Sequence, residues 1–330
     1  MADEYLITGG AGFIGSNIVA ALSDRGDIVH ICDWLEAGDK WKNLAKHVVA
    51  DFIDPFAVMP WLDLKGGDLK AIIHMGAISA TTELDGDQIL ERNYRPTRAL
   101  WDFAAAHGIP FIYASSAATY GDGTAGFADN QSEEALEKLQ PLNLYGWSKH
   151  SFDKYVARQE KTGGKTPPQW AGLKFFNVYG PNEYHKEGMK SVIAQAYPKI
   201  AAGEAVTLFQ SHHPDYEDGG QLRDFVYVKD CVKVILWLLE NPAVSGLFNL
   251  GTGQARSFKD LAAATFVAAG KPENISYIPT PEAIRDKYQY FTEASMQKLQ
   301  KAGYGGNFYS LEDGIAEYVK DYLATEDPYR

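Results

Sequence analysis

The sequence predicts an α/β fold, in which a doubly wound parallel sheet is joined to a smaller, discontinuous α/β lobe. Short apolar runs alternate with longer amphipathic runs through the first half of the chain, and a glycine-rich turn follows the first of them. The second half is less regular, with Pro- and aromatic-containing loops around its apolar runs. Repeated strand-helix units feed parallel strands through right-handed crossovers, which is the basis of this prediction.

Six apolar runs have the length and composition of strands, and they lie at 4–8, 27–33, 46–50, 70–75, 110–115 and 169–177. Amphipathic patterns between them predict helices, most clearly at 13–26 and at 87–108. The second of these ends at Gly108, and a proline follows shortly. Further on, 225–242 is typical of a strand leading into a buried helix, and 247–253 of a strand ending in a glycine turn.

This pattern predicts two regions that share the chain discontinuously. The predicted dinucleotide-binding domain comprises 1–175 with returning segments at about 223–256 and 305–318, and the predicted substrate-binding lobe comprises 176–222, 257–304 and 319–330. Residues 211–222 are polar, acidic and turn-rich, which predicts an exposed loop. His212, His213 and Asp215 in it could be metal ligands, but no further ligand cluster completes a site, so we predict no metal.

Composition narrows the class of partner. With 330 residues and a net charge of −12, the chain can bury a large core but has no general attraction for nucleic acid or acidic membrane surfaces. Cys32 and Cys231 form neither a disulfide framework nor a zinc spacing, and "MADEYLITGG" lacks the features of a signal peptide. The longest apolar run, 234–239, is too short to span a bilayer. We therefore expect an unprocessed cytoplasmic protein that binds a small molecule or a protein.

The turn "TGGAGFIGS" places Gly9, Gly12 and Gly15 between the first strand and the first helix. Such glycines permit a tight turn, a close approach of backbone to a pyrophosphate, and close packing of helix and strand. The second strand ends at Asp33, eighteen residues past Gly15, where a carboxylate can bind an adenosine ribose. The sequence thus predicts a Rossmann-type dinucleotide site.

The choice between NAD and NADP stays open from spacing alone. Asp33 disfavours a 2′-phosphate because two anions would face each other, but Lys40 or Lys42 could neutralise that phosphate. Asp51 and Phe52, directly after the predicted third strand, would stand near the adenine. A capping Asp and a core Phe are the alternative at these two positions.

Tyr145 and Lys149 are four residues apart, so on a helix they share one face. A nearby ammonium favours the ionised phenol, whose reference pKa of ~10 must fall for it to act as a base near neutrality. Ser115 and Ser116 end the fifth predicted strand, and ligands bind at strand carboxyl ends in open parallel sheets. A serine hydroxyl there can bind a substrate alcohol or the carbonyl formed from it, whereas simple strand capping is the alternative.

The glycine turn, Ser116 and the Tyr145/Lys149 pair together resemble the extended short-chain dehydrogenase/reductase family. The segments 223–230 ("RDFVYVKD") and 248–253 ("FNLGTG") are also similar to it. The resemblance implies that Tyr145 is an acid/base and that Lys149 also holds the nicotinamide ribose. Dehydratases of this family carry Asp-Glu after the active-site Ser or Thr, where this chain has two alanines, so the pattern disfavours dehydration.

A closer resemblance, to the ADP-L-glycero-D-manno-heptose 6-epimerase family of lipopolysaccharide precursor synthesis, rests on motifs running in order from residue 9 to about 304. They include "GAISATTELDG", "YASSAATYG", "LNLYGWSKHSFD", "FFNVYGPNEYHKEGM" and "YQYFTEASMQKLQKAGY". The resemblance implies oxidation of the C6″ alcohol of an ADP-heptose to a ketone and return of the hydride to the opposite face. It assigns one acid/base role to Tyr145 and the other to Lys186, for which a solvated loop lysine is the alternative.

The resemblance also implies sets of ligand-binding residues. For the cofactor, NADP with NAD as the alternative, these are Gly9, Gly12, Phe13, Ile14, Gly15, Asp33, Trp34, Lys40, Asp51, Phe52, Met75, Gly76, Ala77, Ile78, Ser79, Asn93, Lys149, Val178 and Lys186. For the substrate they are Ser79, Ser116, Asn177, Gly188, Gln195, Phe209, Gln210, Ser211, His212, Arg223 and Tyr288. An Arg223 guanidinium suits a diphosphate because it can bind it bidentately.

Some positions depart from the family pattern. Pro55 stands where some relatives have a second lysine, which weakens the case for NADP, and Gly188 and Gln195 stand where the family has serine and histidine. The family implies a homo-oligomer, with a pentamer as one option. The alternatives are a UDP-hexose 4-epimerase, a simple dehydrogenase, and a non-catalytic dinucleotide sensor or scaffold.

Overall fold

Seven parallel strands form the central sheet of the computed structural model, which describes residues 2–285 and 289–330. The strands are β1 (Glu4–Thr8), β2 (Ile28–Cys32), β3 (Asp51–Ile53), β4 (Ala71–His74), β5 (Phe111–Ser116), β6 (Trp170–Phe175) and β10 (Gly246–Leu250). Their order is β10-β6-β5-β4-β1-β2-β3, so the direction of winding reverses between β1 and β4. This confirms the predicted doubly wound sheet and places its ligand-binding crevice beside β1.

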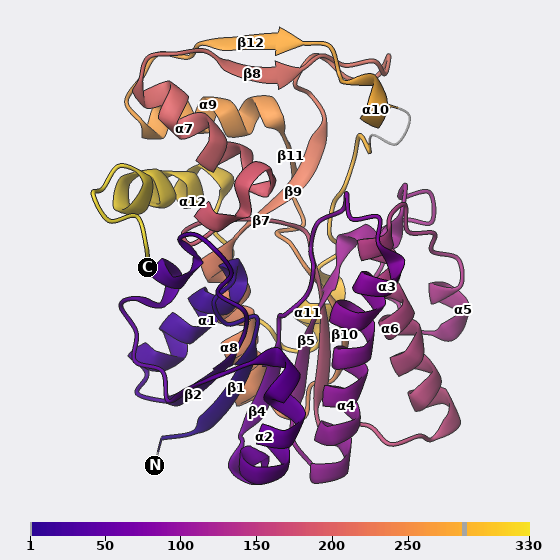
Figure 1. The fold of residues 1–330 in the computed structure, drawn as a ribbon. Helices are drawn as coiled ribbons and strands as arrows, with labels where there is room; N and C mark the ends of the chain where they lie inside the picture. Colours follow the sequence, from indigo (N-terminus) through magenta and orange to yellow (C-terminus); the bar gives the residue numbers. More distant parts are fainter. Residues whose placement is uncertain (1, 286–288) are drawn as a thin grey trace.

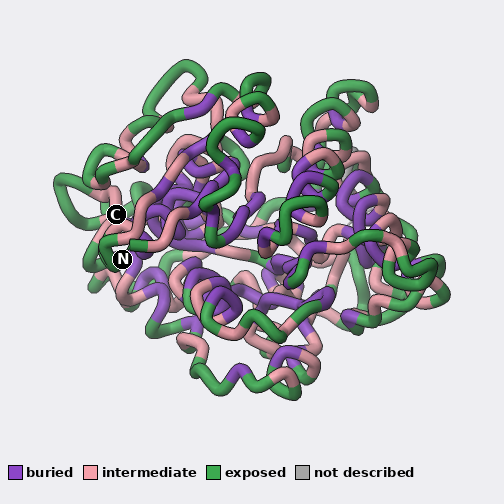
Figure 2. The backbone as a smooth tube through the Cα atoms, turned by 90° about the horizontal axis from the view of Figure 1, so that it is seen from below, coloured by how far each residue is buried: buried purple, intermediate pink, exposed green. Residues whose placement is uncertain are grey.

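Helices cover both faces of this sheet (Figure 1). On one face lie α1 (Phe13–Asp24), α8 (Val228–Glu240) and α11 (Gln297–Lys301), and on the other α2 (Val58–Lys65), α4 (Arg95–His107) and α6 (Leu144–Thr162). Successive strand residues point to opposite faces, so Ile7 packs with the first group and Leu6 with the second. Seen from below, the buried chain fills the middle of the molecule and the exposed chain surrounds it (Figure 2).

A smaller lobe lies beyond the carboxyl ends of the central strands, at the top of Figure 1. It contains the pair β8 (Val206–Phe209) and β12 (Ile275–Ile278), and the helices α7 (Val192–Ala201), α9 (Phe258–Ala268), α10 (Glu282–Arg285) and α12 (Leu311–Tyr318). A second small sheet, β7 (Asn177–Tyr179), β9 (Leu222–Tyr227) and β11 (Ala255–Ser257), runs between the lobe and the central sheet. The lobe has its own apolar core, in which Ile200, Leu208 and Phe266 pack together.

Short helical segments complete the described chain: α3 (Gly86–Ile89), α5 (Glu133–Leu136), η1 (Lys40–Leu44), η2 (Pro55–Ala57), η3 (Gly66–Asp68), η4 (Leu90–Tyr94), η5 (Ala117–Tyr120), η6 (Tyr184–Met189) and η7 (Val319–Leu323). The predicted helix at 87–108 is present as α3, a π-helical turn η4, and α4. It ends at Gly108, whose φ of 70° is the left-handed conformation that glycine adopts readily.

Two predicted strands differ from the structure. The third is not at 46–50 but at Asp51–Ile53, so Asp51 and Phe52 lie within β3 rather than after it. Val48 is 86% exposed, because the apolar run that suggested the strand lies outside the sheet. The sixth is divided at Phe176, since β6 pairs with β5 and β10 whereas β7 leaves to pair with β9.

Some segments lie elsewhere than the sequence suggested. The helix α12 falls in 305–318, which the sequence assigns to the dinucleotide domain, but it packs against α9 of the lobe. Of the predicted exposed loop at 211–222, residues 212–215 and 217 are exposed, but Gln221 is buried and Leu222 begins β9. Both cysteines are free and buried, and no described helix is long and apolar enough to cross a membrane.

Candidate active site

The glycine turn after β1 is packed too closely for side chains. Gly9 has a φ of 66°, and a Cβ on it would lie 2.6 Å from the amide nitrogen of Gly76. A Cβ on Gly15 would lie 2.0 Å from the carbonyl oxygen of Gly9. No side chain caps the N-terminus of α1, whose N-cap is Gly12. The amides of the first turn therefore remain available to an anion, which suits a dinucleotide pyrophosphate.

Asp33 joins the end of β2 to this turn. One carboxylate oxygen accepts a hydrogen bond from the backbone amide of Ala11 at 2.9 Å, and the other accepts from the amide of Trp34 at 2.7 Å and from Lys40 Nζ at 2.9 Å. The carboxylate is thus fixed where the sequence places an adenosine ribose. Lys40 lies beside it, so a cation and an anion stand together at this point.

A second cation, which the sequence did not predict, stacks on Trp34, the residue after Asp33. The guanidinium of Arg92 lies 4.6 Å from the ring centre of Trp34. Lys42, the other lysine considered from the sequence, pairs with Asp39 at 3.0 Å instead. Of the two lysines, Lys40 alone therefore contacts Asp33.

A buried chain of hydrogen bonds connects the glycine turn to the loop after β4. The hydroxyl of Thr97 donates to the carbonyl of Asn93, so its oxygen accepts a hydrogen bond from Nε2–H of His74. The other ring nitrogen, Nδ1 of His74, then accepts from the hydroxyl of Thr8. The amide of Gly76 in turn donates to Thr8 Oγ1 at 3.2 Å. Burial lowers the pKa of His74 to about 3, with the charge of Lys149 as the lesser cause, so the ring is neutral near pH 7.

Asn93 holds residues 75–79 in place. Its carboxamide accepts from the amide of Ile78 at 2.8 Å and donates to the carbonyl of Ile78 at 2.9 Å and to Ser148 Oγ at 3.1 Å. The backbone amide of Met75 also donates to the carbonyl of Thr8 at 3.0 Å, which ties this stretch to β1. Ala77 is half-buried and Ser79 is exposed, so this stretch lies at the surface.

The predicted Tyr145/Lys149 pair occupies the first turns of α6. A Cβ on Gly146 would lie 2.7 Å from the carbonyl oxygen of Ala118, so the start of α6 is pressed against η5, which follows Ser116. Burial raises the pKa of Tyr145, and its hydrogen bond with Ser116 opposes that change. Burial lowers the pKa of Lys149 to about 8, against the charge of Asp153. The start of α6 therefore brings the phenol of Tyr145 to the hydroxyl of Ser116 at the end of β5, and the low-pKa amine of Lys149 follows four residues along the helix.

Beneath this region lies a buried ion pair that the sequence did not predict. Lys174 Nζ contacts Asp153 Oδ2 at 2.7 Å, and both side chains are 0% exposed. Asp153 also accepts from Ser115 Oγ at 2.7 Å and from Tyr113 OH at 3.1 Å. A lysine inside the apolar run of β6, and an aspartate one helical turn after Lys149, were the available signals. The pair fixes α6 against β5 and β6.

Lys186 lies on η6 rather than in an irregular loop, and it is half-buried. Its Nζ is 5.4 Å from the ring centre of Phe13, the first residue of α1. Burial lowers the pKa of Lys186, while the nearby charge of Glu183 raises it. The neighbouring His185 has its pKa lowered to about 4, chiefly by burial, and contacts Asn43 at 3.2 Å. The amine therefore lies beside the start of α1, next to the glycine turn, and is partly removed from water.

The sequence model of the NAD-dependent epimerase/dehydratase family matches residues 5–251 of the chain. This chain belongs to that family. A curated ADP-L-glycero-D-manno-heptose-6-epimerase from Nitratidesulfovibrio vulgaris (strain DP4) is 50% identical over 335 residues, covering 98% of this chain and 99% of the relative. One from Fusobacterium nucleatum is 47% identical over 334 residues, covering 98% and 99%.

Among solved structures, the ADP-L-glycero-D-manno-heptose-6-epimerase of Helicobacter pylori superimposes with a TM-score of 0.79 at 28% identity, covering 97% of this chain and 96% of that one. Membership of the epimerase/dehydratase family supports a nicotinamide dinucleotide as cofactor. The glycine turn, the uncapped α1 and the fixed Asp33 are consistent with holding one.

The residues expected at the substrate lie mainly around the lobe of this family member. Arg223 in β9 donates from its guanidinium to the carbonyls of Leu222, at 2.8 Å, and Gln289. Asn177 is exposed at the start of β7. Gln195 donates to the carbonyls of Gly188 at 3.3 Å and of Lys190 at 2.7 Å, so its amide braces η6.

Other expected substrate residues line the end of β8 and the loop after it. The backbone amide of Gln210 donates to the carbonyl of Ile278 at 2.7 Å, and the backbone amide of Ser211 donates to the carboxylate of Asp218 at 2.8 Å. Phe209 ends β8, and His212 packs edge-on against Tyr290 with ring centres 5.1 Å apart. Tyr288 lies outside the described residues. Within the described part of the chain, no group of three His, Cys, Asp or Glu side chains could hold a metal ion.

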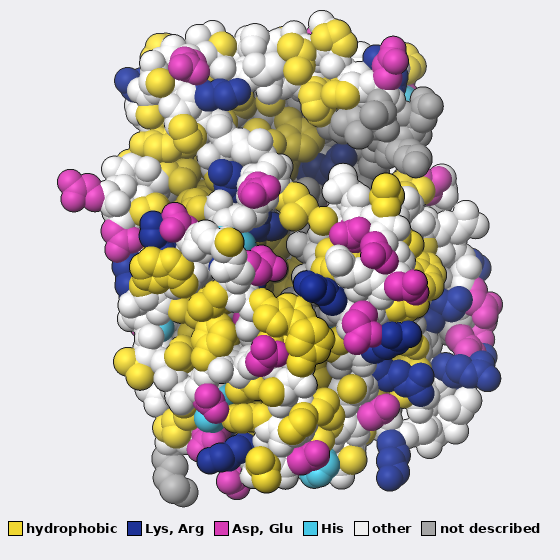
Figure 3. Space-filling model, viewed as in Figure 1, with side chains coloured by type: hydrophobic (Ala, Val, Ile, Leu, Met, Phe, Trp, Pro, Cys, Tyr) yellow, Lys and Arg dark blue, Asp and Glu magenta, His cyan; other side chains and the backbone are white. Residues whose placement is uncertain are grey.

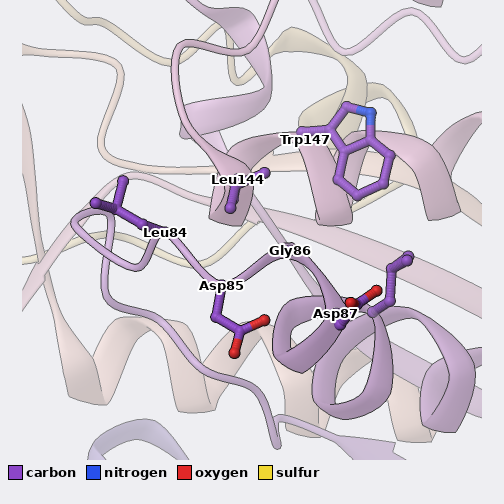
Figure 4. A pocket seen from close by; sticks show the side chains of 7 residues that line it. Leu84, Asp85, Gly86, Asp87, Leu144 and Trp147 are labelled. Carbon is purple, nitrogen blue, oxygen red and sulfur yellow. The ribbon is translucent and has the colours of Figure 1, made fainter.

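The surface between the lobe and the central layers is hollowed on the face seen in Figure 3, and lysine or arginine side chains lie in the hollow. A separate open cavity of about 560 Å³ lies beside the start of α6 (Figure 4). Its lining residues are Leu84, Asp85, Gly86, Asp87, Leu90, Leu144 and Trp147. None of the residues predicted to bind cofactor or substrate is among them, so this cavity is distinct from the candidate site.

Proposed function

We propose that the protein is an ADP-L-glycero-D-manno-heptose 6-epimerase that inverts C6″ of ADP-D-glycero-D-manno-heptose. The observation that carries the proposal is the end-to-end likeness, at up to 50% identity, to relatives that bear this name. Two observations support it: Tyr145 is half-buried beside Ser116, and the partly desolvated amine of Lys186 lies 5.4 Å from the ring centre of Phe13, next to the glycine turn. Inversion at one carbon uses two such groups when a single fixed phenol cannot serve both epimers.

The proposed reaction oxidises the C6″ alcohol to a ketone and then reduces that ketone from its opposite face. A bound nicotinamide dinucleotide would accept the hydride and return it. Tyr145 takes the proton of the hydroxyl as the ketone forms, and Ser116 hydrogen-bonds the same oxygen. Burial disfavours the Tyr145 phenolate. The role we assign to Lys149, four residues further along α6, is to favour that phenolate with its positive charge. When the hydride returns to the opposite face, Lys186 as an ammonium gives a proton to the alkoxide oxygen and becomes a neutral amine. In the reverse direction it takes that proton back as a neutral amine, which its burial favours.

For the cofactor we propose NADP. Lys40, paired with Asp33, and Arg92, stacked on the neighbouring Trp34, offer two cations to an adenosine 2′-phosphate. Arg92 would then supply the second cation, which some relatives supply with a lysine at the position of Pro55. Identification of the dinucleotide released on denaturation tests this, and NAD alone would contradict it.

We further propose a cytoplasmic homo-oligomer that supplies lipopolysaccharide precursor synthesis. The free thiols of both cysteines suit a reducing compartment. Sedimentation velocity of the purified enzyme distinguishes a monomer from a pentamer.

The decisive experiment is a product assay. Purified enzyme with ADP-D-glycero-D-manno-heptose should form the L-glycero epimer without net consumption of cofactor. Tyr145→Phe and Lys186→Met should each lower turnover by about two orders of magnitude or more while cofactor binding stays largely intact, because most of the predicted cofactor contacts are made by other residues. Lys190→Met, at a neighbouring half-buried lysine of the same segment, serves as the matched control. Activity confined to a UDP-hexose would overturn the proposal.

A further inference from the structure

Glu183 is a buried carboxylate that joins three segments of the chain. It is 1% exposed and lies three residues before Lys186. Its Oε1 accepts from the amide of Gly180 at 3.3 Å, from Ser191 Oγ at 2.7 Å and from Tyr318 OH at 3.0 Å, and its Oε2 accepts from the amide of Ser191. One side chain thus closes the segment 180–191 at both ends and ties it to α12.

This carboxylate has no ion-pair partner among residues 2–285 and 289–330, and its four donors are amide or hydroxyl groups. Burying a charged carboxylate without a positive partner costs free energy, and burial therefore raises the pKa of Glu183. The charge of Lys186 lowers that pKa, and the charge of Glu183 raises the pKa of Lys186. The two groups therefore act on each other electrostatically without touching.

The first residues of the segment 180–191 are fixed to α1, the helix that follows the glycine turn. Asn17 in α1 donates to the carbonyl of Pro181 at 3.0 Å, and Asn182 donates to Ser16 Oγ at 3.0 Å. Asn182 has a φ of 73°, a left-handed conformation that asparagine adopts more readily than most non-glycine residues. Glu187, directly after Lys186, has a φ of 47°.

Residues 328–330 cover the outside of this segment. Tyr184 donates its hydroxyl to the carbonyl of Pro328 at 2.8 Å, and the amide of Arg330 donates to Asn182 Oδ1 at 3.0 Å. The segment around Lys186 is therefore held by α1, α7, α12 and residues 328–330 together, with Glu183 at the centre.

We propose that Glu183 is a positioning residue for Lys186, holding the segment 180–191 in the one arrangement that sets the amine beside the dinucleotide turn. The inference rests on the proposed two-base function and adds to it a residue that touches neither cofactor nor substrate. Without the carboxylate, the N-terminus of α7 and the hydroxyl of Tyr318 lose their common acceptor. The segment can then relax, and the amine leaves the position in which proton exchange is efficient.

A double-mutant cycle tests this. Glu183→Ala should lower kcat for epimerisation by about 10²-fold, with KM and bound dinucleotide changed less than about threefold. In a Lys186→Met background the same substitution should lower the residual rate by less than about twofold, because the group through which it acts is already gone. Glu183→Gln, which keeps one acceptor oxygen, should recover part of kcat.

Two further variants keep the test decisive if Glu183→Ala folds poorly. Tyr318→Phe removes one of the four donors and should give a smaller loss of kcat with the same dependence on Lys186. Asp230→Asn alters another buried carboxylate, which binds the Tyr309 amide at 2.7 Å, and should leave the kcat of folded enzyme unchanged.

The outcomes separate the inference from the function on which it rests. An equal loss from Glu183→Ala in the wild-type and Lys186→Met backgrounds would indicate a general structural role and overturn the inference alone. Full activity of Glu183→Ala would do the same. Full activity of Lys186→Met would overturn both the two-base function and the inference.

Discussion

Lys149 illustrates how a single buried amine ties chemistry to stability. Its pKa falls to about 8, against 10.5 in the unfolded chain, because burial disfavours the ammonium. Between these values the unfolded chain retains a proton that the folded chain has released. The free energy of unfolding therefore rises with pH across this window, and the destabilisation is fully present below it.

Replacement of Lys149 removes this dependence. We expect the free energy of unfolding of the wild type to rise relative to that of Lys149→Met by about 2 kcal/mol between pH 7.5 and pH 10. Urea unfolding of the cofactor-free proteins at a series of pH values measures the difference. A constant difference across the series would show that the amine is not desolvated, and Lys165→Met, at an exposed lysine, provides a flat reference.

At the scale of elements, the pair Asp153–Lys174 makes the junction of α6 with β6 depend on charge. Lys174→Met leaves Asp153 buried with only hydroxyl partners, Ser115 and Tyr113. Removing one member of a buried pair costs about 3–5 kcal/mol. We expect a loss of that size in urea unfolding, together with reduced activity, because Ser115 adjoins Ser116, for which we propose a role in the reaction. A loss below about 1 kcal/mol would mean that water or a rearranged partner compensates Asp153.

Three strands with neighbours on both sides were predicted from the sequence at nearly their observed positions. The strands β1, β4 and β5 lie inside the sheet, so they are continuous apolar runs bounded by turns. The strand β3 pairs on one side only, and its first two residues are exposed, so hydrophobicity pointed to the wrong residues. The break between β6 and β7 depends on pairing with β9, which no local pattern records.

The same distinction applies to the site. Roles for Gly9, Asp33 and the Tyr145/Lys149 pair could be proposed from the sequence because these roles depend on spacing along the chain. Glu183 was not, since its partner Tyr318 is 135 residues away and its two nearer partners are reached through backbone folding. Roles that depend on such juxtaposition need coordinates, whereas roles that depend on spacing do not.

At the scale of the whole molecule, cofactor binding should be measurable as stability. A ligand that binds only the folded chain adds RT ln(1 + [L]/Kd), which is about 2.7 kcal/mol at one hundred times Kd. We expect NADP at that excess to raise the free energy of unfolding of stripped enzyme by this amount, and removal of the dinucleotide to lower it again. Equal stabilisation by NADP and NAD at equal concentration would contradict the proposed preference for the 2′-phosphate.

The contacts of residues 328–330 have a kinetic consequence. Arg330 donates from its guanidinium to the carbonyl of Asn17 at 3.3 Å, across 313 positions of the sequence. Contacts of such long range form late, since a large loop must close before they contribute. During synthesis the central sheet can assemble first, and the segment bearing Lys186 reaches its final arrangement only when residues 328–330 have emerged from the ribosome. Dinucleotide binding should therefore precede epimerase activity during refolding, with a lag that spectroscopic probes of the sheet do not show.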